Sequence, residues 1–251
     1  MKSKGKVTGR VLVLDFDDVI LHSERLIDDA ISKYWYTASD RYARNLNQQF
    51  QDNIIKTRDE LNAELDVYYD KKNQMLEEVY PHLKKKIDYG KIINEENISV
   101  KTIKYVRELV KSNRYDMVII ESHYNSEVEK SCKKELIKKL FPGAFFLPVR
   151  FFEQDYLESK ENNVTRVRTS KAEYLKSYLD LNGIEYNFGF FTLIDNSPNN
   201  IKDWVEHGGI GLVFGNTNHP NTISSLKPSV VFNAEKQFAL NSENNNIKRR
   251  R

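Results

Sequence analysis

Three carboxylates follow the first apolar stretch of the chain, in the sequence RVLVLDFDDVILHSE at residues 10–24. Asp15, Asp17 and Asp18 stand where a buried strand would end, and such a group repels itself unless a cation joins it. Carboxylate oxygens suit Mg²⁺, and that ion would also neutralise a phosphate. One carboxylate could then attack phosphorus, while a second, two residues on, could protonate the leaving oxygen. The spacing of Asp15 and Asp17 therefore indicates phosphoryl-transfer chemistry.

Polar side chains also stand at the ends of two later apolar runs. Ser122 and His123 follow one of these runs, and Asp195 and Asn196 close another, while Lys171 opens the helical pattern before the latter. In an open parallel sheet ligands bind beyond the carboxyl ends of the strands, so these residues are predicted to meet over one edge. Ser122 could donate to a phosphoryl oxygen, and Lys171 would add positive charge at a helix N-terminus. His123 could contact the phosphate or leaving group, or could simply pack.

Five short apolar runs have the composition of fully buried strands: residues 11–15, 117–121, 144–149, 190–195 and 209–214. Amphipathic helical patterns separate the later runs. Alternation of apolar strands with helices is typical of a parallel sheet covered on both faces. The sequence therefore predicts an α/β fold, a three-layer, Rossmann-like core, to which residues 229–232 could add a strand.

The predicted helices carry explicit start and stop signals. Ser126 and Ser170 each stand three residues before a glutamate, which is the pattern of a capping box. Ser197 precedes a proline, which favours the first position of a helix. Gly183 and Gly208 stand where the second and third of these helices should end.

Residues 24–97 interrupt the alternation of strands and helices. They are helical in pattern, rich in Tyr, Asp, Asn and Lys, and contain no strand-like run. We expect a catalytic core formed by residues 6–23 and 98–238, with residues 24–97 as a helical cap inserted after the first strand. Residues 239–251 are rich in Asn and end in KRRR, which is the composition of a disordered basic tail.

The charge and cysteine content restrict the class of protein. The 251 residues carry a net charge of +3, but Lys248 and the three arginines after it supply four positive charges. The basic character is thus a property of the tail and gives little support for a nucleic-acid partner. The single cysteine, Cys132, rules out an internal disulfide and suits a reducing compartment. No apolar run approaches the roughly 20 residues of a membrane span, so we expect a cytoplasmic protein without a membrane partner.

The strand-end residues resemble the motifs of the haloacid dehalogenase (HAD) superfamily of phosphohydrolases. The first motif of that family is an apolar strand followed by Asp-x-Asp-x-(Thr/Val), matched by DFDDV at residues 15–19. The second is a strand ending in Ser or Thr, matched by Ser122, and the third is a lone lysine, matched by Lys171. The fourth is an acidic strand tip, matched by Asp195. The order and spacing agree over nearly the whole chain apart from its tail.

The resemblance implies a role for each of these residues. Asp15 would be the nucleophile that forms an aspartyl-phosphate, and Asp17 the general acid and base. The motif residues assigned to the phosphate are Ser122 and Lys171, and His123 is added because it follows Ser122 at the end of the strand. The residues assigned to Mg²⁺ are Asp15, Asp17 through its backbone carbonyl, Asp195 and Asn196. The inserted helices would form a cap over a small phosphorylated substrate.

Residues 193–214 look most like the 5'-nucleotidase and 5'(3')-deoxyribonucleotidase branch of that superfamily, which makes a (deoxy)nucleoside 5'-monophosphate the expected substrate. Asn196 departs from the pattern because that branch usually has a second Asp there, so weaker Mg²⁺ binding is expected. Two alternatives remain open. One is a phosphatase for nucleic-acid 3' ends, which the basic tail would modestly favour. The other is a non-catalytic HAD-fold binding protein, which only Asn196 favours.

Overall fold

The computed structural model describes residues 6–65, 67, 87–124, 126–150, 156–158, 164–166, 170–215 and 218–249. For residues 23, 24, 33–43, 150, 156–158, 164–166 and 242–249 it describes the backbone alone. Internal contacts divide the chain into two compact units, one formed by Met1–His22 with Ile93–Arg251 and the other by Ser23–Ile92. The bounds of the second unit, Ser23–Ile92, are similar to the bounds 24–97 that the sequence suggested for the helical insertion.

The first unit is built on a six-stranded sheet with the order β3-β2-β1-β6-β7-β8, in which every pairing is parallel. Its strands are β1 (Val11–Asp15), β2 (Met117–Tyr124), β3 (Phe145–Arg150), β6 (Phe191–Asp195), β7 (Ile210–Phe214) and β8 (Thr222–Ile223). The chain adds strands on one side of β1 and then returns to add strands on the other side. The boundary between β1 and β6 is therefore the topological switch point, where open α/β sheets place their ligands.

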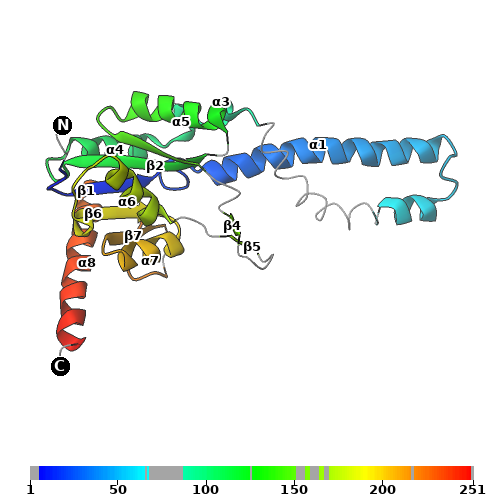
Figure 1. The fold of residues 1–251 in the computed structure, drawn as a ribbon. Coiled ribbons are helices and arrows are strands. Elements are labelled where there is room, and N and C mark those ends of the chain that lie inside the picture. The colour runs from blue at the N-terminus through cyan, green and yellow to red at the C-terminus, as the bar shows by residue number, and fades with distance from the viewer. Residues whose placement is uncertain are drawn as a thin grey trace. The chain divides into compact units, whose positions relative to one another are not determined.

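Helices cover both faces of this sheet (Figure 1). One face carries α6 (Lys171–Leu181) and α7 (Pro198–Glu206), which share a hydrophobic core with the strands. On the other side, α4 (Val100–Lys111) contacts β2, and α5 (Glu127–Leu140) contacts β2 and β3. The last helix, α8 (Pro228–Arg249), packs on β7, β8 and α4. The predicted α/β fold with three layers is thus confirmed.

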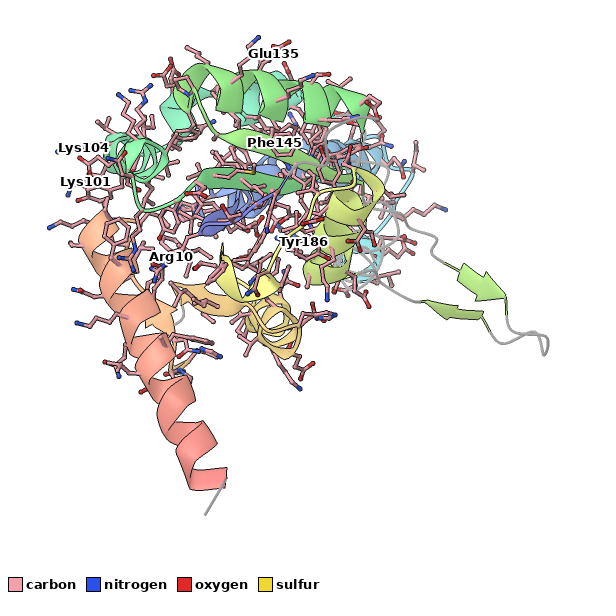
Figure 2. The ribbon with its side chains drawn as sticks, turned by 60° about the vertical axis from the view of Figure 1, so that its left-hand side comes forward. Arg10, Lys101, Lys104, Glu135, Phe145 and Tyr186 are labelled. Atoms are coloured by element: carbon pink, nitrogen blue, oxygen red, sulfur yellow. The ribbon has the colours of Figure 1, made fainter. Side chains whose placement is uncertain are left out.

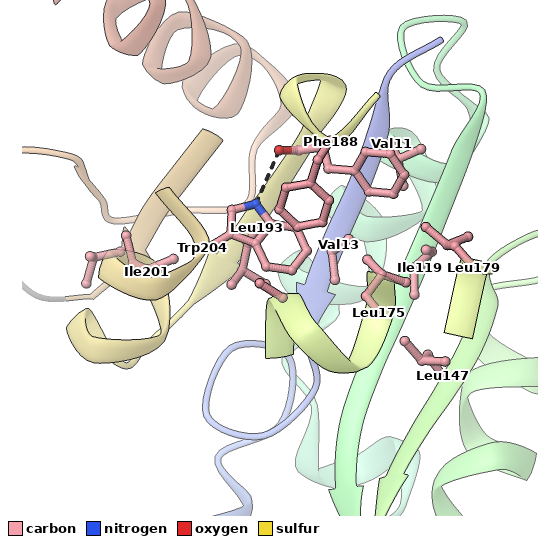
Figure 3. Packing of buried hydrophobic residues seen from close by; sticks show 13 residues of the cluster. Val11, Val13, Ile119, Leu147, Leu175, Leu179, Phe188, Leu193, Ile201 and Trp204 are labelled. Carbon is pink, nitrogen blue, oxygen red and sulfur yellow. Dashed lines mark hydrogen bonds between the residues drawn. The ribbon is translucent and has the colours of Figure 1, made fainter. Parts of the chain in front are cut away.

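An aromatic group packs α7 against the start of β6 (Figure 3). Trp204 is fully buried, its ring centroid lies 4.6 Å from that of Phe188, and its indole Nε1 donates to the carbonyl of Phe191 at 3.3 Å. Phe188 in turn stacks on Phe191 at 5.3 Å. Fully burying an aromatic side chain of this size contributes about 1.5–3 kcal/mol. This packing fixes the helix that follows β6, and with it the carboxyl end of β6.

The predicted serine caps mark the starts of three helices, although only one of the two predicted capping boxes is complete. Ser126, Ser170 and Ser197 are the N-caps of α5, α6 and α7, and each side chain accepts from the backbone N–H three residues on. The cap of α6 is a complete capping box with Glu173. Just beyond the ends of α6 and α7, Gly183 and Gly208 adopt φ values of +65° and +92° respectively. Glycine takes that left-handed conformation without a Cβ penalty.

The C-terminal region differs from the prediction. Residues 229–232 lie in α8 and form no strand, because Pro228 provides the backbone angle of a first helical turn. The helix also runs through most of residues 239–251, as far as Arg249, where a disordered tail was expected. Figure 2 shows the start of α8 beside α4, which carries the labelled Lys101 and Lys104. The early turns of α8 are anchored in the core, which favours continuation of the helix into the polar segment.

The anchor of α8 is a buried carboxylate. Glu235 is 2% exposed and accepts hydrogen bonds from Tyr115 Oη at 2.9 Å and Thr192 Oγ1 at 2.7 Å. Arg114 donates to its other oxygen at 3.0 Å. A buried carboxylate with this many hydrogen-bond donors avoids the free-energy cost of an unpaired buried charge. These hydrogen bonds tie α8 to β6 and to the segment before β2.

Shorter elements complete the first unit. They are the 3₁₀ helices η1 (Glu95–Asn97) and η2 (Phe188–Phe190) and an antiparallel pair, β4 (Tyr156–Glu158) with β5 (Val164–Arg166), which the sequence did not predict. The described part of the second unit is helical, with α1 (Ser23–Gln51), helical residues 58–65 and α3 (Tyr89–Ile92). Among the described residues, no helix is both long and apolar enough to cross a membrane.

Candidate active site

One lysine joins the carboxyl ends of the two strands at the switch point. Asp15 ends β1 and Asp195 ends β6, and both side chains are buried. Lys171 Nζ lies 3.1 Å from Asp15 Oδ1 and 2.8 Å from Asp195 Oδ2. The capping box at the start of α6 sets where Lys171, the first residue of that helix, enters the site. Three of the residues predicted from the sequence therefore meet at one point.

A third carboxylate, which sequence reasoning missed, reaches the same lysine. Glu121 on β2 is paired in register with Asp15, so both side chains lie on the same face of the parallel sheet. Its Oε2 lies 2.5 Å from Lys171 Nζ, and Glu121 is only 2% exposed. The sole signal in the sequence is an acid at the end of a run of buried apolar residues. We refer to Asp15, Glu121, Lys171 and Asp195 as the Lys171 cluster.

The three carboxylates of the Lys171 cluster carry more negative charge than the single ammonium of Lys171 can balance. Burial raises the pKa of Asp15 well above its usual range; Lys171 opposes this effect, while Asp195 and Glu121 add to it. Burial likewise raises the pKa of Glu121, again against the opposing effect of Lys171. For Lys171, burial alone would lower the pKa, but the three carboxylates outweigh it and hold the pKa well above the ordinary value. The site is therefore suited to an additional cation.

Asp17 and Ser122 belong to a second, neighbouring group. Ser122 is fully buried, and its Oγ donates to Asp17 Oδ2 at 2.6 Å and to the His123 carbonyl at 3.1 Å. Lys133 of α5 donates to the same Asp17 oxygen at 2.9 Å. Lys133 also lies 2.8 Å from Glu129. We call Asp17, Ser122, Glu129 and Lys133 the Lys133 cluster; Lys133 was not singled out from the sequence, and Glu129 was singled out only as a capping residue.

Asp17 lies in a tight turn that follows β1. The backbone N–H of Leu21 donates to the carbonyl of Phe16 at 3.0 Å, and that of Asp18 donates to the carbonyl of Leu21 at 2.7 Å. Asp18 adopts a φ of +59°, a conformation that aspartate tolerates better than most residues. Phe16 is fully buried beneath the turn. These contacts hold the Asp17 backbone close to the end of the strand.

The loop after β6 orients Asp195 from the other side. The backbone N–H of Ser197 donates to Asp195 Oδ1 at 2.7 Å, and Asn200 Nδ2 donates to Oδ2 at 3.0 Å. Asn200 was not among the predicted site residues.

Asn196 is exposed, whereas Asp195 is fully buried. His123 Nδ1 lies 3.6 Å from Glu121 Oε1, so this side chain faces the acidic part of the Lys171 cluster.

The donor set fits a magnesium ion in its chemistry. The Lys171 cluster offers hard carboxylate oxygens with two more negative than positive charges, and the ion pairs with Lys171 balance the buried Asp15 Oδ1 and Glu121 Oε2 only in part. Among the described residues, no three His, Cys, Asp or Glu side chains are arranged to form a metal site by themselves. Backbone carbonyl and water oxygens would therefore have to complete the coordination, which is common for Mg²⁺.

Comparison with known proteins gives similarity in structure alone. No family model matches the sequence, and no curated protein matches it. The fold is similar to that of HAD-superfamily hydrolases. YfnB from Bacillus subtilis, named as a HAD-hydrolase and solved bound to magnesium, is 16% identical with a TM-score of 0.49, over 87% of this chain and 95% of that one.

Two further solved structures have comparable values. A HAD-superfamily hydrolase of subfamily IA from Geobacter sulfurreducens is 11% identical with a TM-score of 0.48, over 89% of this chain and 96% of that one. The β-phosphoglucomutase of Clostridium difficile is 15% identical with a TM-score of 0.46, over 93% of this chain and 100% of that one. Similarity this low assigns no activity, so the function below is inferred from the site residues.

Proposed function

We propose that this protein is a Mg²⁺-dependent phosphomonoesterase that acts through an aspartyl-phosphate on Asp15. The observation that carries the proposal is the convergence of Asp15, Lys171 and Asp195 at the switch point of the sheet. A carboxylate nucleophile, a cation for the phosphoryl oxygens and a second carboxylate for a metal ion are the parts that such a reaction requires.

The proposed reaction has two displacement steps. Asp15 attacks phosphorus, the bond to the leaving oxygen breaks, and Asp17 gives its proton to that oxygen. Water then attacks the aspartyl-phosphate, Asp17 takes a proton from that water, and inorganic phosphate leaves with Asp15 regenerated. Lys171 binds the phosphoryl oxygens and keeps Asp15 oriented. A Mg²⁺ ion held by Asp15, Asp195 and the backbone carbonyl of Asp17, with Asn196 as a further ligand, would supply charge neutralisation.

The proposed substrate is a small phosphorylated metabolite, with a (deoxy)nucleoside 5'-monophosphate as the first choice. The support is the resemblance of residues 193–214 to nucleotidases, within which Asn200 holds Asp195. A helical insertion of the kind formed by Ser23–Ile92 also favours a compact substrate, because caps of this type exclude water from a small ligand.

One observation favours a second candidate, a HAD-fold protein that binds a ligand without catalysis. Glu121 places an additional buried carboxylate beside the proposed nucleophile and takes up part of the charge of Lys171. The negative charge of Glu121 would repel an approaching phosphate unless a metal ion is bound. The presence of both Asp15 and Asp17 argues against this candidate, because a protein that only binds a ligand needs neither a nucleophile nor a general acid.

The test is phosphate release from a panel of 5'- and 3'-nucleotides, sugar phosphates and a 3'-phosphorylated oligonucleotide, with Mg²⁺ and with chelator. Metal-dependent release from one class, lost in Asp15→Asn, would support the proposal and identify the substrate. Release from the oligonucleotide alone would favour an enzyme of nucleic-acid 3' ends. Absence of release from every compound, with Mg²⁺ shown to bind, would point to a substrate outside the panel, whereas absence of both release and Mg²⁺ binding would favour the non-catalytic candidate.

A further inference from the structure

Lys133 is a buried cation outside the predicted site, and its close polar contacts lead to the ends of β1 and β2 and to the start of α5. Its side chain is 2% exposed, and Nζ lies 2.9 Å from Asp17 Oδ2, 2.8 Å from Glu129 Oε1 and 2.7 Å from the His123 carbonyl. Lysine is rarely buried to this extent unless its charge is paired. The position of Lys133 thus requires an explanation in terms of its partners.

Anchoring α5 would not require all three contacts. Glu129 lies one helical turn before Lys133, and the His123 carbonyl belongs to the end of β2, so these two acceptors already compensate the buried ammonium within neighbouring elements. The third contact reaches Asp17, which lies more than a hundred positions earlier in the chain. The ammonium also lies 5.8 Å from the ring centroid of Phe16, the residue between the two proposed catalytic aspartates.

Hydrogen bonds hold one of the two carboxylate oxygens of Asp17, Oδ2. Lys133 and Ser122 both donate to Oδ2, from α5 and β2 respectively. Two donors on one oxygen restrict rotation of the carboxylate about its Cβ–Cγ bond. The ammonium of Lys133 is itself held by Glu129 and by the His123 carbonyl, which fixes the position from which it donates to Asp17.

We propose that Lys133 is a positioning residue that holds the Asp17 carboxylate in the orientation needed for proton transfer to the leaving oxygen. The inference rests on the proposed function and deepens it. When Asp17 gives up its proton it becomes an anion, and an adjacent ammonium stabilises that anion as it forms. Ser122 assists through the same oxygen. Lys133 itself contacts neither the nucleophile nor the phosphate in this scheme.

The test compares Lys133→Met with Lys134→Met, which removes an exposed lysine from the next position of the same helix. Two substrates are used with each variant: a nucleoside 5'-monophosphate, whose alkoxide leaving group needs a proton, and p-nitrophenyl phosphate, whose nitrophenolate leaves without one. General acid catalysis is worth about 10²–10⁴-fold. We expect Lys133→Met to lower kcat/KM on the nucleotide by about 10²-fold, with a much smaller loss on the aryl ester and wild-type values for Lys134→Met. The ratio kcat/KM reports the first displacement, so it is not affected by the later step in which Asp17 takes a proton from water with either substrate.

A second comparison separates positioning from a general loss of structure. In an Asp17→Asn background, adding Lys133→Met should cause little further loss of kcat/KM, because the group that Lys133 orients is already inactive. Lys133→Gln keeps the length of the side chain and a donor, and provides a second variant if Lys133→Met does not fold. Circular dichroism and thermal unfolding identify the variants that are folded and can be compared.

Equal losses of kcat/KM on both substrates in a folded variant, or additive losses in the Asp17→Asn background, would overturn the positioning role while leaving the phosphatase proposal intact. A wild-type protein that releases phosphate from neither substrate, nor from any of the panel above, would instead overturn the proposed function, and the inference with it. The two failures are thus distinguished by the wild-type measurement.

Discussion

Asp15 and Glu121 lie directly opposite each other at the ends of β1 and β2, and both carboxylates approach the ammonium of Lys171, at 3.1 and 2.5 Å. The pairing places two buried acids at the same level of the sheet, one of them the proposed nucleophile. A third acid, Asp195, completes the set from β6. The balance among these charges governs several properties that can be measured.

Replacing Asp15 by asparagine should abolish turnover while leaving the fold intact. The amide has nearly the same shape but cannot attack phosphorus, so we expect kcat to fall by on the order of 10⁴-fold or more. Loss of one buried negative charge beside two others should not destabilise the protein. Phosphate release and thermal unfolding of the variant test both parts, and activity close to that of wild type would remove Asp15 as nucleophile.

Glu121→Gln should stabilise the metal-free protein, and increasingly so as the pH rises. The folded-state pKa of Glu121 is raised above its unfolded value of about 4.3. Between these two values the native state binds more protons than the unfolded state, so this group makes the wild-type free energy of unfolding fall with increasing pH. The glutamine removes that contribution.

Urea unfolding in chelator, from mildly acidic to mildly alkaline pH, measures the Glu121 effect. Glu135→Gln, which removes an exposed carboxyl on α5, is the matched control and should leave the pH dependence unchanged. A difference between Glu121→Gln and wild type that stays constant with pH would contradict the prediction, because the buried carboxyl would then have the same pKa in both states.

Asn196→Asp should tighten Mg²⁺ binding. Asn196 follows Asp195 directly and is exposed, so an added carboxylate would increase the negative charge beside the proposed ion at little desolvation cost. Calorimetric titration of the wild-type and variant proteins with MgCl₂ gives the comparison. An unchanged affinity would show that residue 196 lies outside the metal coordination.

Gly209→Ala should destabilise the first unit of the chain. A Cβ at Gly209 would collide with the indole of Trp204, and the neighbouring Phe188 ring leaves it little room to move. Overpacking of this kind costs about 1–3 kcal/mol. Urea unfolding monitored by tryptophan fluorescence measures the loss, and a change below about 0.5 kcal/mol would show that the aromatic group rearranges freely.

Features set by local pattern were predictable from the sequence. The five apolar runs became β1, β2, β3, β6 and β7, and the serine caps set the starts of α5, α6 and α7. Strand-end position and helix start also brought Asp15, Asp195 and Lys171 together. Such features follow from short-range periodicity and from the rule that parallel strands present their carboxyl ends at one edge.

Features set by register or helix rotation were not predictable in this way. Glu121 reads as the last residue of a strand, and only its pairing with Asp15 shows which face its side chain takes. Lys133 lies well inside α5, and its contact with Asp17 depends on how that helix is rotated on the sheet. Ser122 was expected to bind phosphate, and the structure directs its hydroxyl to Asp17. Each of these requires long-range geometry that one sequence does not specify.

The strand order has a consequence for how the molecule is made. β1 ends at Asp15, yet its two partners, β2 and β6, begin at Met117 and Phe191. During synthesis the central strand therefore has neither partner until β2 is made and lacks its second partner until β6 is made, and contacts this distant in sequence slow folding. Carboxylates at its end would delay aggregation during that interval, since charge discourages edge-to-edge pairing.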